Sequence, residues 1–274
     1  MQIGIIGGRG RMGSLFGQVF SRAGYTVSVA GRETDLGKSD VVTGSDIVMV
    51  SVPIRETRQV IGQIAPVLRT DQLVCDLTSL KTDPVNAMLA SRAEVIGLHP
   101  MFGPTVPSLL RQTIIMCPER CREETRKKME EIFEREGARV TFSTPMEHDR
   151  IMAVVQGLTH FVTLSMAETM RRAGMSPGRT DEFTSPVYQI ELGLVGRLLS
   201  QDPELYADML CMNPFVPEVL RLCNESVKDL SATVIGGDAE GFTRLFQQNA
   251  DDFGEFRERS LEFTDFLIRA MVTR

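Results

Sequence analysis

The stretch Ile3-Gly4-Ile5-Ile6-Gly7-Gly8-Arg9-Gly10-Arg11-Met12-Gly13 decides the fold of the first half of the chain. It places the pattern G-x-G-x-x-G, as Gly8, Gly10 and Gly13, between an apolar run that predicts a strand and a run that predicts a helix. In such a loop Gly8 permits a tight turn, Gly10 lets a pyrophosphate approach the backbone, and Gly13 allows close helix packing. Because the helix N-terminus attracts phosphates, we expect a dinucleotide to contact Gly8, Arg9, Gly10, Arg11, Met12 and Gly13.

From this loop onward, short apolar runs alternate with helical stretches up to about residue 142, which is typical of a parallel sheet covered on both faces. Beyond Ser143-Thr144-Pro145 the apolar period becomes that of helices. The sequence therefore predicts an α/β fold: a Rossmann-type, doubly wound parallel sheet in residues 1–145, then an all-helical dimerisation domain in residues 146–274. Strands are predicted at 2–6, 26–30, 47–50, 73–76, 94–97, 113–117 and 139–142, and the clearest helices at 11–23, 54–67 and 122–136.

The end of the second predicted strand bears on which dinucleotide binds. An acidic residue there would bond the ribose 2′-hydroxyl of NAD, but Val29-Ala30-Gly31-Arg32 offers glycine and then arginine. This favours NADP, whose 2′-phosphate Arg32 could hold in bidentate fashion, with Arg9 as a second contact. The alternative is NAD, with Arg32 solvated and Glu33 bonding the hydroxyl.

A histidine follows the fifth predicted strand, in Gly97-Leu98-His99-Pro100-Met101-Phe102-Gly103-Pro104. Glycine and proline predict a rigid turn here, and an imidazole with a pKa near ~6.5 can accept a proton from a substrate hydroxyl. The alternative is a structural histidine that bonds a backbone carbonyl.

Polar loops also follow the third and fourth predicted strands. Because ligands of open parallel sheets lie at the carboxyl ends of strands, we expect these loops to meet His99 in one crevice. A Ser79–Lys81 nucleophile pair is disfavoured, since no nucleophile elbow accompanies it. The residues of these loops assigned to the site are Ser51, Val52, Pro53, Asp76 and Ser79.

Composition excludes several classes of function. The net charge of −6 and a pI near 5.3 argue against a nucleic-acid surface. The five cysteines are odd in number and lack the spacing of a zinc site or disulfide framework, so we expect reduced thiols, no metal and a cytoplasmic protein. We find no apolar run near the ~20 residues of a membrane span and no targeting segment before the first strand.

The helical half carries two apolar stripes. The first predicts an amphipathic helix, and the second, rich in phenylalanine, is more typical of core or a subunit interface than of a cofactor site. We therefore expect a homodimer formed largely by this domain. The stripes are Ile151, Val154, Val155, Leu158, Phe161 and Val162, then Phe242, Phe246, Phe253, Phe256, Phe263 and Phe266.

Taken in order, these motifs resemble the prephenate dehydrogenases over nearly the whole chain, and most closely the dehydrogenase half of the bifunctional chorismate mutase/prephenate dehydrogenases, without the mutase half. The His-Pro-Met-Phe-Gly-Pro string is the most specific of them. The others are the glycine-rich start, Ser51-Val52-Pro53-Ile54, Asp76-Leu77-Thr78-Ser79-Leu80-Lys81, Glu147-His148-Asp149, Gln156 with His160-Phe161, and Ser185-Pro186 through Gly196-Arg197 to Gln201-Asp202-Pro203 and Tyr206-Ala207-Asp208.

The resemblance implies oxidative decarboxylation of prephenate to 4-hydroxyphenylpyruvate in tyrosine biosynthesis. His99 matches the family's catalytic histidine, Ser79 the serine that helps to orient it, and Arg197 the arginine that grips a substrate carboxylate. An arginine fork suits a carboxylate, although an ordinary surface ion pair is the alternative. Substrate contacts or satisfied polar core residues are equally open for His148, Gln156 and His160.

One departure concerns the substrate side chain. Many family members carry an acidic residue after Gly-Pro, where this chain has Thr105. Arogenate would bring an ammonium group that needs a carboxylate, so Thr105 leans toward prephenate. The alternatives are an arogenate or 4-amino-4-deoxyprephenate dehydrogenase, another NADP-dependent reductase, and a non-enzymatic NADP(H) sensor.

Overall fold

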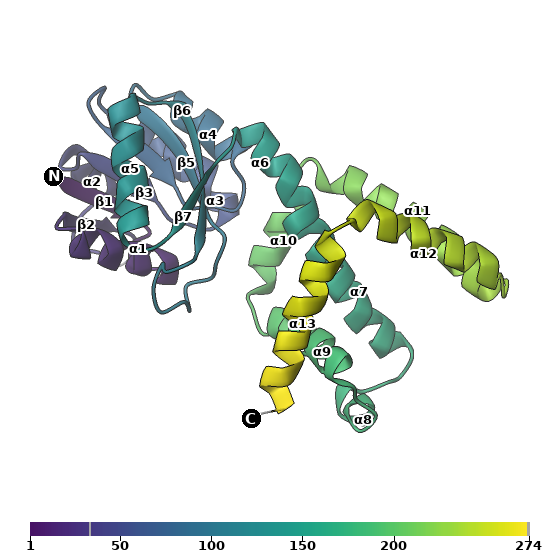
Figure 1. Cartoon of the computed structure of the whole chain (residues 1–274). Coiled ribbons are helices and arrows are strands. Elements are labelled where there is room, and N and C mark those ends of the chain that lie inside the picture. Colours follow the sequence, from purple (N-terminus) through teal and green to yellow (C-terminus); the bar gives the residue numbers. More distant parts are fainter. Residues whose placement is uncertain (33, 273–274) are drawn as a thin grey trace. The chain divides into compact units, whose positions relative to one another are not determined.

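The computed structural model describes residues 1–32 and 34–272, and its first region is a seven-stranded sheet in the order β2-β1-β3-β4-β5-β6-β7 (Figure 1). All seven predicted strands are present. They are β1 (Gln2–Ile6), β2 (Thr26–Ala30), β3 (Ile47–Val50), β4 (Leu73–Asp76), β5 (Glu94–Pro100), β6 (Thr113–Arg120) and β7 (Arg139–Phe142). The predicted Rossmann-type sheet is therefore confirmed.

Two details of the sheet differ from the prediction. β6 pairs antiparallel with β5, so the expectation of a wholly parallel sheet is wrong at this strand. The reason is the connection 101–112, which contains no helix to carry the chain back across the sheet. β5 also continues past Gly97 to Pro100, so His99 lies inside a strand and not in a turn.

Helices cover both faces of the sheet. One face carries α1 (Arg11–Arg22) and α5 (Glu123–Arg135). The other carries α2 (Lys38–Thr43), α3 (Ile54–Ile64) and α4 (Thr82–Leu89), with the 3₁₀ turn η1 (Ala65–Val67) after α3. The sequence prediction gave bounds only for the three clearest helices, and α2 and α4, which are short, were not among them.

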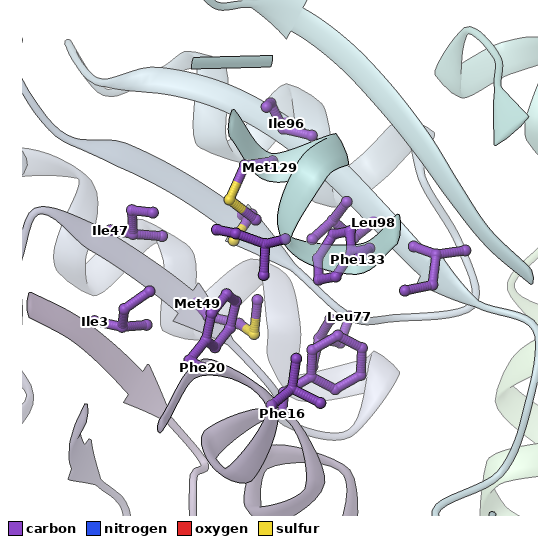
Figure 2. Packing of buried hydrophobic residues seen from close by; sticks show 14 of the residues in the cluster. Ile3, Phe16, Phe20, Ile47, Met49, Leu77, Ile96, Leu98, Met129 and Phe133 are labelled. Carbon is purple, nitrogen blue, oxygen red and sulfur yellow. The ribbon is translucent and has the colours of Figure 1, made fainter. Parts of the chain in front are cut away.

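The core on the α1 and α5 face is built from aromatic side chains packed on apolar strand residues. Figure 2 shows Phe16 and Phe20 of α1 beside Phe133 of α5, with ring centroids of Phe16 and Phe133 6.0 Å apart in an edge-on arrangement. The strands supply Ile3, Ile47, Met49, Ile96 and Leu98 to the same cluster.

The contacts of the chain divide it into two units, Met1–Ala153 with Ala207–Pro214, and Val154–Tyr206 with Phe215–Arg274. α6 (Pro145–Met152) belongs to the first unit, and the second is helical. Its elements are α7 (Thr159–Arg172), α8 (Pro177–Asp181), α9 (Pro186–Leu199), α11 (Val216–Ile235), α12 (Ala239–Phe253) and α13 (Phe256–Val272), while α10 (Pro203–Cys211) enters both units. The boundary expected after residue 145 stays a prediction.

The first apolar stripe does not follow one regular helix, because a π-helical segment, η2 (Ala153–Leu158), interrupts it. The side chains of Ile151, Val154, Val155 and Val162 are about half exposed. By length and composition alone, the stretch Pro145–Arg172 could cross a membrane, which the sequence reasoning did not anticipate. One such stretch among the described residues is weak evidence for a span, because helices of soluble proteins pass the same test.

Candidate active site

The glycine-rich loop lies where β1 is flanked by β2 on one side and β3 on the other, the switch point at which open α/β sheets bind ligands. Gly7, and not Gly8 as expected, makes the tight turn, with φ of 81°. A Cβ on Gly7 would lie 2.1 Å from the carbonyl oxygen of Ser51, whose N–H donates to Ile6 at 2.8 Å. The ends of β1 and β3 are therefore held together by a contact that only glycine permits.

The remaining glycines keep the loop close to the helix. A Cβ on Gly13 would lie 2.6 Å from the carbonyl oxygen of Gly7, which confirms the predicted close packing, and one on Gly8 would meet Val29 at 2.5 Å. Gly10 is the N-cap of α1 and is exposed with its neighbours Arg9 and Arg11, whereas Met12 is half-buried. This open helix N-terminus fits the pyrophosphate of a dinucleotide.

Arg32 lies just beyond β2, as expected for a contact to the adenosine ribose. Its side chain is 89% exposed and forms an ion pair with Glu56 at 3.2 Å. Glu33, the alternative contact to the ribose, lies outside the described residues. At the end of β3, Val52 is half-buried and Pro53 is the exposed N-cap of α3.

Asp76, at the end of β4, is fully buried and forms an ion pair with Lys81. The Lys81 ammonium also donates to the carbonyl oxygen of Leu98 at 2.7 Å, and the N–H of Thr78 donates to Asp76 at 3.0 Å. Asp76 thus keeps Lys81 paired in the protein interior. The predicted contact of Asp76 with a cofactor stays a prediction. Ser79, in the same loop, is half-buried.

His99 is the centre of the polar cluster. Its Nδ1 lies 2.8 Å from Nε2 of His148 on α6, and both side chains are buried. Burial lowers the pKa of His99 well below its ordinary value, and the neighbouring His148 and Lys81 lower it further. His99 is therefore neutral near pH 7, the form that accepts a proton.

Asp149 completes this cluster. Its Oδ1 lies 2.8 Å from Nδ1 of His148 and accepts the N–H of Lys81 at 2.8 Å, while Oδ2 accepts the N–H of Thr82 at 2.9 Å. Burial raises the pKa of Asp149, but the hydrogen bonds from His148 and from the backbone of Thr82 and Lys81 outweigh it, so the pKa lies below the usual value. The carboxylate is therefore ionised and held on both oxygens.

The helical unit holds the other predicted substrate residues. His160 packs edge-on against Tyr206, with ring centroids 4.8 Å apart, and burial lowers its pKa. Arg197 on α9 is exposed, and its charge opposes the burial that raises the pKa of Tyr206. Gln156 lies in the π-helical segment and is half-buried.

Sequence reasoning did not assign three of these residues. Lys81 was considered only as part of a nucleophile pair, and Asp149 and Tyr206 were seen only as members of motifs. The available signals were a charged residue in the loop after a buried strand, for Lys81, and a carboxylate beside a histidine at a helix start, for Asp149. Among the described residues no group of three or more His, Cys, Asp or Glu is arranged to hold a metal ion.

Two family models match the chain: the prephenate dehydrogenase nucleotide-binding domain at residues 22–142 and the prephenate dehydrogenase dimerization domain at residues 144–248. A "Probable arogenate/prephenate dehydrogenase" of Methanocaldococcus jannaschii is 34% identical over 100% of this chain and 66% of its own length. The "T-protein" of Enterobacter agglomerans is 34% identical over 97% of this chain and 71% of its own length. The chain thus spans about two thirds of the length of these relatives.

The fold is also that of a solved structure. The prephenate dehydrogenase of Aquifex aeolicus, in complex with hydroxyphenyl propionate and NAD+, superposes with a TM-score of 0.74 at 20% identity, covering 93% of this chain and 98% of that one. The match supports the sheet followed by a helical region as one family architecture.

Proposed function

The chain belongs to the prephenate dehydrogenase family, and from this premise we propose that it converts prephenate to 4-hydroxyphenylpyruvate and carbon dioxide in tyrosine biosynthesis. The observation that carries the proposal is His99, a buried neutral imidazole at the carboxyl end of β5. A proton acceptor in a sheet that also bears a dinucleotide loop is what the oxidation of a hydroxyl group requires.

In this reaction His99 accepts the proton of the substrate hydroxyl as hydride leaves the ring carbon that bears it. Oxidised nicotinamide, when bound, supplies the hydride acceptor. The bond from the ring to its carboxylate then breaks, and its electron pair makes the ring aromatic. The phenolic oxygen regains the proton from His99, and Ser79 helps to orient that histidine.

NADP is the cofactor we favour over NAD, with Arg32 as the contact to the 2′-phosphate and Arg9 as a second one. Support comes from the exposed guanidinium just beyond β2, whose ion pair with Glu56 is open to solvent. An exposed ion pair of this kind is worth about 0–1 kcal/mol, so a phosphate can displace the Glu56 carboxylate.

For the substrate we propose that Arg197 binds a carboxylate of prephenate, with Gln156 and His160 as further contacts. Thr105 is exposed and neutral in the connection after β5, which favours prephenate over arogenate. The printed name of the M. jannaschii relative includes both substrates, so arogenate is the first alternative.

A cytoplasmic homodimer is the assembly we propose. The phenylalanines of α12 and α13 are largely exposed in the single chain, among them Phe246, Phe253 and Phe263. An apolar surface of this kind is typical of a subunit interface, and the helical region matches a dimerization domain. Sedimentation of a fully active monomer at micromolar concentration would contradict the dimer.

One assay tests the function. The purified protein is mixed with prephenate or arogenate, each with NADP or NAD, and the absorbance of reduced nicotinamide is followed. We expect the fastest rise with prephenate and NADP. No rise in any of the four mixtures would exclude prephenate and arogenate as substrates and favour a 4-amino-4-deoxyprephenate dehydrogenase, a reductase of another substrate or an NADP(H) sensor.

A further inference from the structure

Three buried side chains of the first unit form a hydrogen-bonded row, here called the Asp149–His148–His99 network. Asp149 Oδ1 lies 2.8 Å from His148 Nδ1, and His148 Nε2 lies 2.8 Å from His99 Nδ1. None of the three is more than 2% exposed. The network joins β5 to α6, and its geometry fixes where the protons lie.

The proton positions follow from the carboxylate. An ionised carboxylate only accepts hydrogen bonds, so His148 must carry its proton on Nδ1. The neutral ring of His148 then accepts at Nε2, which requires His99 to donate from Nδ1. A neutral His99 protonated at Nδ1 has its basic lone pair on Nε2, the nitrogen that must take a substrate proton.

The surrounding charges keep both rings neutral. Burial lowers the pKa of His148, although its hydrogen bond to Asp149 opposes this shift. The groups that face the two rings are Lys81 at the start of α4, Asp76 at the end of β4 and Asp149. Because Lys81 and Asp76 are paired with each other, Asp149 is the carboxylate that accepts a hydrogen bond from His148.

We propose that His148 and Asp149 are positioning residues that hold His99 in the Nδ1-protonated tautomer, so that Nε2 acts as the base. The inference rests on the proposed function in that His99 is the proton acceptor. It replaces the expectation that His148 contacts the substrate. Asp149 suits this role because the backbone of Lys81 and Thr82 fixes its two oxygens, so its orientation does not depend on the histidines.

The tautomer can be measured without any turnover. In ¹⁵N-histidine-labelled full-length protein at pH 7.5, we expect His99 to show a protonated Nδ1 and an unprotonated Nε2, assigned by the loss of its signals in His99→Asn. A His99 ring protonated at Nε2 in the resting protein would overturn the proposal. This measurement decides the arrangement even if prephenate proves not to be the substrate.

Two substitutions of His148 separate positioning from packing. The amide oxygen of His148→Gln can still accept the Nδ1 proton of His99, whereas His148→Leu fills the site without an acceptor. We expect His148→Gln to keep the tautomer and to lose kcat by less than about tenfold, and His148→Leu to lose about 10²-fold or more with KM nearly unchanged. Equal losses in the two variants, with the tautomer intact in both, would show that His148 only fills space.

A matched pair of carboxylate substitutions tests Asp149. Asp149→Asn removes the charge that fixes both tautomers, and we expect kcat to fall by about 10–100-fold with a mixed His99 tautomer. Asp83→Asn is the control, because Asp83 lies in the first turn of α4, next to the backbone N–H groups that Asp149 accepts, but pairs with Arg58 at the surface. We expect Asp83→Asn to leave kcat and the His99 tautomer unchanged. An unchanged kcat and tautomer in folded Asp149→Asn would also overturn the proposal.

Discussion

The two units differ in what they bury. The first unit buries charged and polar side chains, and Lys81, Asp76 and His148 all form hydrogen bonds or ion pairs within it. The helical unit instead leaves large apolar side chains exposed, such as Phe246 and Phe253. Buried polar groups are costly unless they are paired, and exposed apolar surface is unfavourable unless something covers it.

The two units therefore contribute different parts of the proposed activity. The hydrogen bonds that join Asp149, His148 and His99 lie within the first unit of a single chain, so this unit builds the proposed proton acceptor. In the proposed function, the exposed groups of the helical unit bind the substrate and a second copy of the chain. Substitutions in the first unit should therefore affect kcat or cofactor use, and those in the second unit KM or assembly.

The largest effect is expected for His99→Asn. The amide retains a polar group but cannot take the hydroxyl proton, so kcat for prephenate should fall by about 10²–10⁴-fold while cofactor affinity stays nearly intact. In the wild type, kcat/KM should rise with pH as His99 loses its proton. This rise in kcat/KM should occur well below pH ~6.5, because burial, His148 and Lys81 all lower the pKa of His99.

Steady-state kinetics from pH 5 to 8 check this prediction. Circular dichroism and cofactor titration of the variant serve as controls for folding. If His99→Asn keeps most of its turnover, or the same rise in kcat/KM with pH, the base is another residue, with His148 and His160 the next candidates.

The second effect concerns cofactor choice in the first unit. Arg32→Glu removes a charge-assisted contact to the 2′-phosphate and adds repulsion, a loss of about 1.5–3 kcal/mol or one to two decades in kcat/KM with NADP. Efficiency with NAD should change much less. The matched control is Glu56→Gln, which frees Arg32 from its ion pair and should leave or improve the use of NADP. If the wild type prefers NAD, and Arg32→Glu does not alter kcat/KM with either cofactor, Arg32 is only solvated.

Sequence alone predicted the sheet well, for a physical reason. Each strand of a sheet covered on both faces is a short apolar run, and the loop at Gly8, Gly10 and Gly13 marks the first crossover. The antiparallel β6 escaped prediction because the direction of a strand is set by its connection and not by its own residues. The positive φ at Gly7 escaped because it depends on Ser51, forty-four positions later in the sequence.

The site was predicted in its residues but not in its connections. His99 and His148 were both named, yet their contact joins residues 49 positions apart and depends on β5 reaching Pro100. The roles of Lys81 and Asp149 come from burial and hydrogen bonds, which no local pattern encodes. Exposure of Arg197 likewise depends on the packing of the helical unit.

The third prediction uses the buried histidines to test the stability of the first unit. The pKa values of His99 and His148 are lowered in the folded protein, so below pH ~6.5 the unfolded chain binds protons that the folded protein does not. The free energy of unfolding should therefore decrease as the pH falls from 6.5, by at most about 1.4 kcal/mol per pH unit for each histidine. Urea unfolding of wild type and His99→Asn at pH 7.5, 6.5 and 5.5 checks this. An equal slope in both proteins would show that His99 contributes nothing to it.

The smallest effect is expected in the helical unit, for Arg197→Ala. An arginine that grips a carboxylate binds the ground state and the transition state alike, so its loss should raise KM for prephenate and leave kcat nearly unchanged. Because Arg197 is exposed, solvent weakens the pair, and we expect a rise of about tenfold, or ~1.4 kcal/mol. For Arg197→Lys we expect a KM between those of the wild type and Arg197→Ala, because lysine keeps the charge but not the bidentate fork.

An ultraviolet titration provides a readout for Arg197 that does not depend on prephenate. The Arg197 charge opposes the rise in the pKa of Tyr206 that burial causes, so Arg197→Ala should raise that pKa further. A shifted tyrosine titration with an unchanged KM would place Arg197 beside Tyr206 but outside the substrate site. A loss confined to kcat would place Arg197 in the chemical step, and the division between an orienting first unit and a binding helical unit would then fail.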